Sequence, residues 1–183
     1  MDILTALATF SMIETEHLYL RPFSFADAEA FFTISQNADN LDFIFPQQET
    51  KAASDYLLVH GFLKSPLGVW AIEDKVSQSL IGAIKCEKTD LLKQETEIGY
   101  FVKKEFQGRG LATEALSKVA RICLKACRFK KLHLITHLDN IASQRVAEKT
   151  GFRCVRRYKG SDRYTHKVRQ YLAFEMTRGD DHE

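Results

Sequence analysis

A glycine-rich turn in the middle of the chain carries the clearest chemical signal. Residues 107–112 read QGRGLA and lie between a strand-like run, Glu97–Val102, and a strongly helical run, Ala112–Cys127. Two glycines at a strand-to-helix junction allow a tight turn and leave backbone N–H groups uncovered. The helix that follows adds unpaired donors and partial positive charge at its N-terminus. The turn therefore predicts a cradle for an anion, and a phosphate or pyrophosphate suits it best.

The spacing of this turn excludes the two common phosphate-binding loops. There is no G-x-x-x-x-G-K-[ST] pattern, and Thr113 replaces the third glycine of a G-x-G-x-x-G loop. The pattern Q-x-x-G-x-A instead resembles the acetyl-CoA loop of the GNAT N-acetyltransferases, whose signature is [RQ]-x-x-G-x-[GA]. The resemblance implies that this loop binds the pyrophosphate of acetyl-CoA. The residues concerned are Gln107, Gly108, Arg109, Gly110, Leu111 and Ala112.

Two flanking blocks extend the resemblance. Upstream, EIGYFV over Glu97–Val102 is similar to the fourth strand of the family. Downstream, Asn140–Ser143 and then Lys149–Phe152 are similar to its N-x-[AS]-S and [EK]-x-G-F blocks. The combination most resembles the RimJ/RimL-like branch, which acetylates the N-termini of ribosomal proteins and related amines. The resemblance runs from about His17 to about Met176, nearly the whole chain.

The resemblance implies an acetyl-CoA-dependent N-acetyltransferase that acts on a primary amine. We expect the acceptor to be the α-amine of a protein or peptide N-terminus. Its pKa of about 8 leaves more of it neutral than a lysine with a pKa of about 10.4. Two alternatives stay open: an acetyltransferase for small-molecule amines, and a module that binds acyl-CoA without turnover. No metal is expected, because no H-x-x-x-H pair falls on a helix; His133 and His137 lie on a strand-like run.

The same resemblance assigns the binding of the cosubstrate's arm. It implies a splayed fourth strand whose exposed backbone at Tyr100, Phe101 and Val102 binds pantetheine and points one N–H at the thioester oxygen. Gly99 supports this independently, since a glycine inside a strand often marks a close backbone approach. Asn140 is expected to cap the following helix or to contact the pantetheine amides, and it could do both.

Glu97 and Ser143 are the candidates for proton transfer. Glu97 matches the family's carboxylate and could accept the amine's proton, directly or through water, or hold the cationic amine. An ordinary exposed strand residue is the competing interpretation. Many GNAT enzymes protonate the leaving thiolate with a Tyr at a position that is Ala147 here. The RimJ/RimL-like pattern implies that Ser143 is the acid instead, and a local hydrogen bond within the helix start is the alternative.

Strand and helix patterns must position these residues. Antiparallel strands come first and a β-α-β-α-β stretch follows, which predicts a mixed α/β fold with helices on both faces of the sheet. The resemblance makes this a GNAT fold: a mostly antiparallel twisted sheet of about seven strands, splayed at the fourth and fifth, with about four helices. We expect strands at 17–23, 67–73, 80–87, 95–103, 132–138, 152–158 and 167–177, and helices from Ser24 or Phe25 and at 50–64, 111–127 and 140–150.

Size and composition narrow the possible organisation and partners. The 183 residues fit a single domain over 1–183, with a core at about 17–177 and peripheral tails at 1–15 and 178–183. A formal charge of +2 argues for neither nucleic acid nor membrane. No run approaches the roughly 20 apolar residues of a membrane span, and Asp2 stands where a signal peptide carries a base. Four cysteines without C-x-x-C favour a reducing compartment. We therefore expect a cytoplasmic protein, monomeric or homodimeric.

Two aromatic segments are expected to form the acceptor cleft. One is Phe43–Phe45, between the first two helices, and the other is Tyr158–Tyr164 in the final hairpin. The same aromatics could equally belong to the core. Basic residues crowd that hairpin, either as its solvated face or as a site for an acidic substrate or for cofactor phosphates. They are Arg153, Arg156, Arg157, Lys159, Arg163, Lys167 and Arg169.

Overall fold

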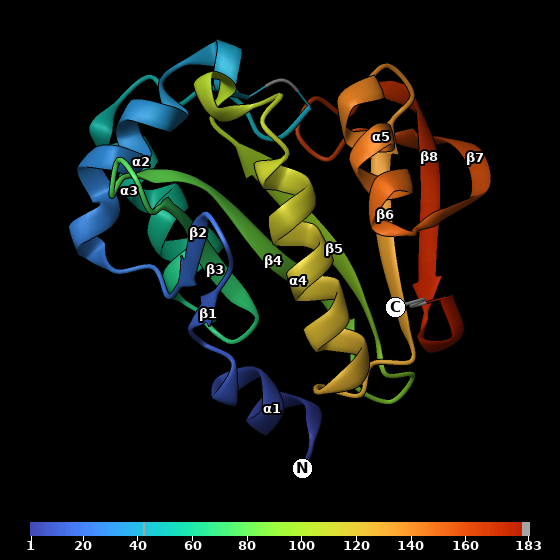
Figure 1. The fold of residues 1–183 in the computed structure, drawn as a ribbon. Coiled ribbons are helices and arrows are strands. Elements are labelled where there is room, and N and C mark those ends of the chain that lie inside the picture. The colour runs from blue at the N-terminus through green and yellow to red at the C-terminus, as the bar shows by residue number, and fades with distance from the viewer. Residues whose placement is uncertain (42, 181–183) are drawn as a thin grey trace.

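One mixed sheet runs through the molecule, as the ribbon in Figure 1 shows. The computed structural model describes residues 1–41 and 43–180. The eight strands lie in the order β1-β2-β3-β4-β5-β6-β8-β7. All neighbours are antiparallel except β5 and β6, which are parallel. The strands are β1 (Ile13–Glu14), β2 (Leu18–Arg21), β3 (Val69–Asp74), β4 (Leu80–Asp90), β5 (Glu95–Val102), β6 (Lys131–His137), β7 (Arg153–Ser161) and β8 (Val168–Thr177). The expected mixed α/β fold class is confirmed.

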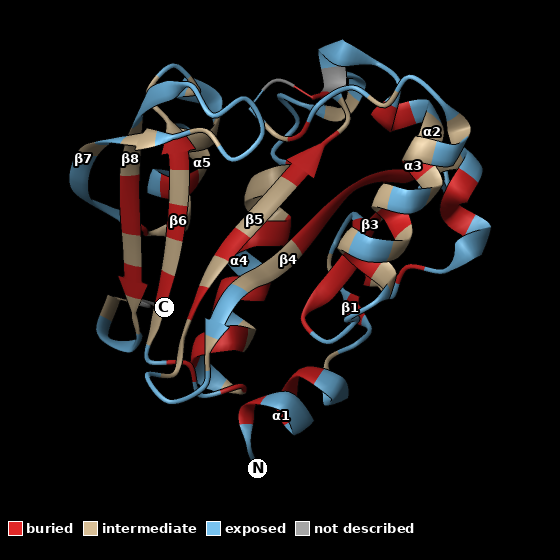
Figure 2. Cartoon of the chain, turned by 180° about the vertical axis from the view of Figure 1, so that it is seen from behind, coloured by how far each residue is buried: buried red, intermediate tan, exposed pale blue. Residues whose placement is uncertain are grey.

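Helices cover both faces of this sheet, and each face has its own hydrophobic cluster. The described part of the chain holds α1 (Ile3–Thr9), α2 (Ala28–Ser35), α3 (Lys51–Leu58), α4 (Leu111–Lys125) and α5 (Ile141–Thr150). Helices α1, α4 and α5 pack on the cluster around Trp70 and Leu116, and α2 and α3 pack on the one around Phe31 and Phe101. Seen from behind, α2 and α3 lie over β3 and β4, whereas no helix covers β5, β6 and β8 on that side (Figure 2).

Short-range hydrogen bonds explain where several helices begin and end. The Thr50 hydroxyl accepts the N–H of Ala53 at 3.1 Å and caps α3. The expected helix at 50–64 continues past α3 as one wide turn, η3 (Val59–Leu63), closed by the Lys64 N–H on the Val59 carbonyl at 2.8 Å. Single 3₁₀ turns occur at η1 (Phe25–Asp27), η2 (Ala38–Asn40), η4 (Lys104–Phe106) and η5 (Arg178–Asp180).

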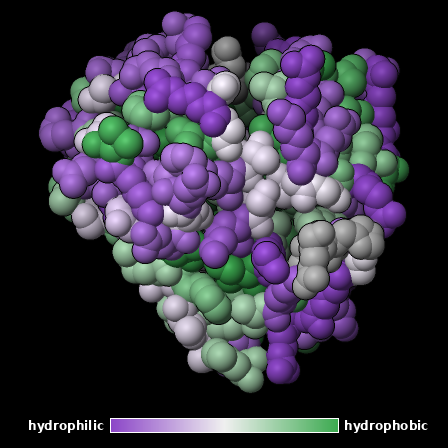
Figure 3. All heavy atoms as spheres, viewed as in Figure 1, coloured by the Kyte–Doolittle hydropathy of each residue, from purple (hydrophilic) through white to green (hydrophobic). Residues whose placement is uncertain are grey.

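The N-terminal segment corrects the sequence-based expectation. Residues 1–15 were expected to be a peripheral tail, but they form α1 and β1, which bring the strands to eight and the α-helices of the described chain to five. Ile3, Ala6 and Leu7 are buried in the main cluster, and the Asp2 carboxylate caps α1 by accepting the Thr5 N–H at 3.0 Å. The exposed face of α1 is mixed, with Leu4 and Ala8 beside Thr5 and Thr9, and Figure 3 shows hydrophobic side chains over the lower end of the molecule.

The C-terminal tail is also tied to the core as far as it is described. The Arg178 guanidinium donates to the Leu124 and Phe129 carbonyls at 3.0 and 3.1 Å. Asp180 accepts the Thr177 N–H at 2.9 Å. Of the tail expected at 178–183, residues 181–183 lie outside the described residues.

Truncating a buried side chain of α1 tests the correction. Leu7 is 2% exposed, so Leu7→Ala should lower the free energy of unfolding by about 2–5 kcal/mol through a lost apolar contact and a cavity. Leu4 lies on the same helix but is 43% exposed, and Leu4→Ala should change stability by less than about 1 kcal/mol. Urea unfolding of both variants measures the difference. Equal small effects would mean that α1 is a peripheral tail after all.

The splay between β5 and β6 is the feature of the sheet that matters for function. The two strands pair only where Glu95–Glu97 face Lys131–His133. Beyond Glu97, β5 continues to Val102 paired with β4 on one side, while β6 turns toward β8. The backbone edge of β5 beyond Glu97 therefore faces a gap, as the expected splay requires; in this numbering the family's fourth and fifth strands are β5 and β6.

Candidate active site

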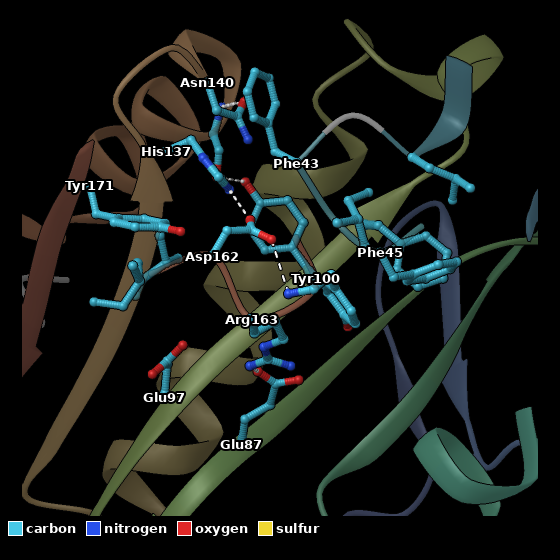
Figure 4. Close-up of a pocket in the computed structure, with 18 of the residues that line it drawn as sticks. Phe43, Phe45, Glu87, Glu97, Tyr100, His137, Asn140, Asp162, Arg163 and Tyr171 are labelled. Carbon is cyan, nitrogen blue, oxygen red and sulfur yellow. Dashed lines mark hydrogen bonds and ion pairs between the residues drawn. The ribbon is translucent and has the colours of Figure 1, made fainter. Parts of the chain in front are cut away.

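A cavity of about 940 Å³ lies where β4, β5 and β6 meet the β7–β8 turn. This is within the size range of ligand sites, which is about 300–1,000 Å³. Phe43 and Phe45 line one side of it (Figure 4). Tyr158 and Tyr164 are also among its lining residues. The two expected aromatic segments therefore face one cavity. Phe45 also belongs to the core, since it is 7% exposed and its ring lies 5.5 Å from that of Phe101.

The glycine-rich loop lies outside this cavity, at the start of α4. Gly108 and Gly110 have left-handed φ angles of 73° and 79°, which favour glycine, and a Cβ at either would meet no atom within 4 Å. Open space above both glycines suits an approaching phosphate better than a packing role for the loop. Leu111 is buried and Ala112 half-buried in the first turn of α4, so only their backbones could reach a ligand.

Two side chains of this loop have structural partners. The Gln107 amide donates to the Val102 carbonyl at 2.8 Å and fixes the loop to the end of β5. The Arg109 guanidinium lies 5.0 Å from the centre of the Phe106 ring and is exposed. The Gln107 side chain is therefore engaged by Val102. The backbone of the loop and the Arg109 side chain remain available for the ligand contacts expected there.

Helix α5 begins at the open side of the splay. The Asn140 side chain accepts the Ser143 N–H at 3.2 Å, so the expected cap is present. The Ser143 hydroxyl lies 3.0 Å from the Tyr100 hydroxyl, which reaches it from β5 across the gap (Figure 4). Burial raises the pKa of Tyr100, and the hydrogen bond to Ser143 opposes this to a smaller extent. Ala147, where many relatives carry a Tyr, is fully buried.

Two carboxylates lie side by side on the floor of the cavity. Glu97 on β5 is ion-paired with Lys88 at 2.8 Å. Glu87 is its cross-strand partner on β4 and contacts Lys85 at 2.9 Å and Arg163 at 3.5 Å. Gly99 makes room for Glu87, because a Cβ there would come within 3.3 Å of the Glu87 carboxylate. Both carboxylates are mostly shielded, with side chains 18% exposed.

A histidine closes the cavity at the end of β6. The His137 ring lies between Phe43 and Tyr171, at 5.1 and 4.8 Å, and its Nε2 is 3.7 Å from Asp162 (Figure 4). Burial lowers the pKa of His137, and the nearby Asp162 only partly opposes this. The neutral imidazole is therefore the favoured form at neutral pH.

Comparison with known proteins identifies this arrangement. Residues 17–153 match the family model described as "Acetyltransferase (GNAT) domain". The chain belongs to the GNAT acetyltransferase family. It is accordingly an acyltransferase enzyme of the N-acetyltransferase type, from a family that uses acetyl-CoA as cosubstrate.

Individual GNAT relatives support this assignment. The chain is 28% identical over 147 residues to the uncharacterized N-acetyltransferase YoaA of Bacillus subtilis. The match covers 78% of this chain and 83% of that protein. It is 29% identical over 73 residues to the ribosomal-protein-serine acetyltransferase of Escherichia coli, covering 40% of this chain and 41% of that protein. A crystal structure of a GCN5-related N-acetyltransferase from Brucella melitensis superposes with a TM-score of 0.81 at 20% identity, covering 93% of this chain and 80% of that chain.

The structure brings five of the expected site residues together. Glu97, Tyr100, Phe101, Asn140 and Ser143 all line the cavity. Val102 is buried at the end of β5, and residues 107–112 lie beyond it, outside the cavity. The glycine-rich loop and the cavity are thus separate, and the open edge of β5 runs between them.

Sequence reasoning missed Glu87 and His137 as cavity residues. Glu87 ends the strand expected at 80–87, and its place opposite Glu97 follows from the β4–β5 register. His137 was expected on a strand-like run and not as a metal ligand. The basic residues of the final hairpin fall into two groups. Arg163 and Arg169 line the cavity, whereas Arg153, Arg156 and Arg157 are exposed on β7, as a solvated face would be.

No metal site or membrane span is visible in the part of the chain that the structure describes. Residues 1–41 and 43–180 contain no group of three His, Cys, Asp or Glu side chains placed to hold a metal ion. No helix among them is long and apolar enough to cross a membrane. Cys123 and Cys127 are buried in the core, as expected, and burial raises the pKa of Cys127 to about 11.

Proposed function

We propose that this protein transfers the acetyl group of acetyl-CoA to the α-amine of a protein or peptide N-terminus. The observation that carries the proposal is the meeting of the splayed β5 edge with an open cavity that holds two shielded carboxylates. The gap admits an extended thioester arm, and the cavity admits an amine. A site of this shape brings an acyl donor and an amine together from two directions.

The donor side is formed largely by backbone. The uncovered N–H groups at Gly108 and Gly110, at the start of the 15-residue helix α4, suit the pyrophosphate. The edge of β5 at Tyr100–Val102 suits the amides of the pantetheine arm, as a strand would. Asn140, used as a cap, holds α5 at the place where the thiol would leave. Acetyl-CoA supplies the activated acetyl group.

The acceptor side supplies charge for the amine. Glu97 binds the ammonium form or accepts its proton, and Ser143 gives a proton to the leaving sulfur. A chain terminus fits an open cavity whose walls are aromatic, because the peptide that follows the amine needs an exit. The ribosomal-protein-serine acetyltransferase among the relatives supports a protein acceptor. A small-molecule amine remains the second candidate, supported by the enclosure of the two carboxylates.

A peptide array tests the acceptor class. Thiol release from acetyl-CoA is measured with peptides that carry free or formylated N-termini, each with and without lysine, and with a panel of small amines. Turnover that requires the free N-terminus supports the proposal. Acetylation of blocked lysine peptides, or of small amines alone, would contradict the proposed N-terminal acceptor. The assignment as an acetyltransferase would still hold. Acetyl-CoA binding without any turnover would indicate a binding module.

Substituting Glu97 tests its role with a matched control. Glu97→Gln should lower kcat/KM for the amine about 100-fold at neutral pH, because a positioned base or counter-charge is lost. The loss should shrink as the pH approaches the pKa of the amine, since an amine that is already neutral does not have to be deprotonated before it attacks. Glu95 lies two positions earlier on β5 but pairs with His133 at 3.0 Å outside the cavity, so Glu95→Gln should have little effect. Equal effects at the two positions, or a larger one for Glu87→Gln, would remove Glu97 from this role.

A further inference from the structure

The hydrogen bond between Tyr100 and Ser143 spans the splay. Tyr100 comes from β5 and Ser143 from the first turn of α5, and their hydroxyl oxygens lie 3.0 Å apart. Both residues line the cavity that faces the acceptor. The ring of Tyr100 packs against the main hydrophobic cluster, so its position is set by the core. The phenol therefore connects the acceptor cavity to the hydroxyl at the start of α5.

The chemistry of acetyl transfer requires such a connection. The amine nitrogen forms a C–N bond and must lose one proton, while the C–S bond breaks and the sulfur must gain one. An aliphatic hydroxyl is a much weaker acid than a thiol, so Ser143 can release its proton only if it receives another one at the same time. A phenol, with a pKa of about 10, is a suitable donor for that second proton.

We propose that Tyr100 and Ser143 form a two-hydroxyl relay that moves one proton from the attacking amine nitrogen to the leaving sulfur. Ser143 O–H gives its proton to the sulfur as the C–S bond breaks, and the electron pair of that bond stays on sulfur. Tyr100 O–H gives its proton to the Ser143 oxygen. The Tyr100 oxygen then takes the proton that the nitrogen releases, which restores both hydroxyls. The relay rests on the proposed function. In that proposal Ser143 alone protonates the sulfur, and the relay adds Tyr100.

Two further features support the relay. Burial raises the pKa of Tyr100, so the phenol is protonated at neutral pH and ready to donate. The buried Ala147 leaves no phenol at the position where the family resemblance implies one, and Tyr100 brings one from β5 to Ser143, one helical turn before Ala147. A purely structural role, in which the hydrogen bond only holds the gap at a fixed width, is the competing explanation.

Replacing Tyr100 with a fluorotyrosine separates these explanations. A 3,5-difluorotyrosine keeps the hydroxyl and the hydrogen bond but lowers the pKa of the phenol. The relay predicts that the basic limb of the single-turnover pH profile moves to lower pH by the same amount. The probe reaction is acetyl-CoA with the best peptide of the array. Tyr19 lies on β2 outside the cavity, and the same replacement there should leave the profile unchanged.

A second measurement counts the protons in flight. Turnover of the wild type in mixtures of H₂O and D₂O should depend on the deuterium fraction along a curve, as expected for more than one moving proton. Tyr100→Phe should lower kcat about 100-fold, with KM for acetyl-CoA within about threefold, and should make that dependence linear. An active wild type with an unshifted difluorotyrosine profile and a linear dependence overturns the relay and leaves the acetyltransferase standing. Absence of wild-type turnover with every amine contradicts both.

Discussion

Gly110→Glu should weaken acetyl-CoA binding by about 100-fold or more, which corresponds to about 3 kcal/mol. The backbone of Gly110 has a φ of 79°, and a Cβ there points into open space rather than into the protein. A glutamate would therefore occupy the mouth of the loop and oppose the pyrophosphate with its charge. Isothermal titration with acetyl-CoA measures the effect.

A neutral variant separates charge from strain. Gly110→Gln has the same left-handed strain and nearly the same volume, so the difference between the two affinities is the contribution of the charge. Thermal melts of both variants must show a folded protein, because Gly110 is the N-cap residue of α4. A folded Gly110→Glu with wild-type affinity would show that the loop is only a turn between β5 and α4.

Ser143→Ala should lower kcat about 100-fold and leave KM for acetyl-CoA almost unchanged. The hydroxyl is needed only when the thiolate leaves, so its loss affects the transition state and not the bound ground state. The variant also removes the hydrogen bond to Tyr100, but it leaves the start of α5 intact. The cap of α5 uses the backbone N–H of Ser143, which donates to Asn140 at 3.2 Å and survives the substitution.

The matched control lies on the neighbouring helix. Ser117 is exposed on α4, and Ser117→Ala should leave both constants unchanged. Single-turnover kinetics are needed, because slow product release would hide the loss. A Ser143→Ala enzyme within about threefold of wild type would leave the hydroxyl only a structural hydrogen bond, with no part in proton transfer.

Features set by neighbouring residues could be predicted from the sequence. The cap at Asn140 was predicted from residue type, and the left-handed Gly151, with a φ of 101°, ends α5 directly after the predicted helix at 140–150. These signals act within one helical turn, so no knowledge of the fold is required. The glycine pair of the loop was recognised for the same reason.

Contacts across the sheet could not be predicted in the same way. Glu87 faces Glu97 because of the β4–β5 register, which shifts between Glu87 and Asp90. His137 meets Asp162 because the β7–β8 turn folds back over the end of β6. Register depends on the packing of whole strands against each other, so the residue types within one strand do not reveal it. Helix α1 was missed because seven residues are too few to form a stable helix without the core beneath them.

Several expectations stay predictions. They are the roles of the site residues, the identity of the acceptor, the RimJ/RimL-like branch, the cytoplasmic location, and the choice between monomer and homodimer. The first three depend on the experiments above.

The short pairing between β5 and β6 makes the molecule mechanically uneven. Three residue pairs join these strands, whereas seven join β4 to β5 and seven join β6 to β8. Backbone amides of β6, β8 and β7 can therefore exchange with solvent through openings that leave β1–β5 closed. A donor bound along the edge of β5 and against α5 would cross-link the two parts. Its binding free energy would then be added to the cost of every such opening, so the ligand acts as a removable part of the sheet.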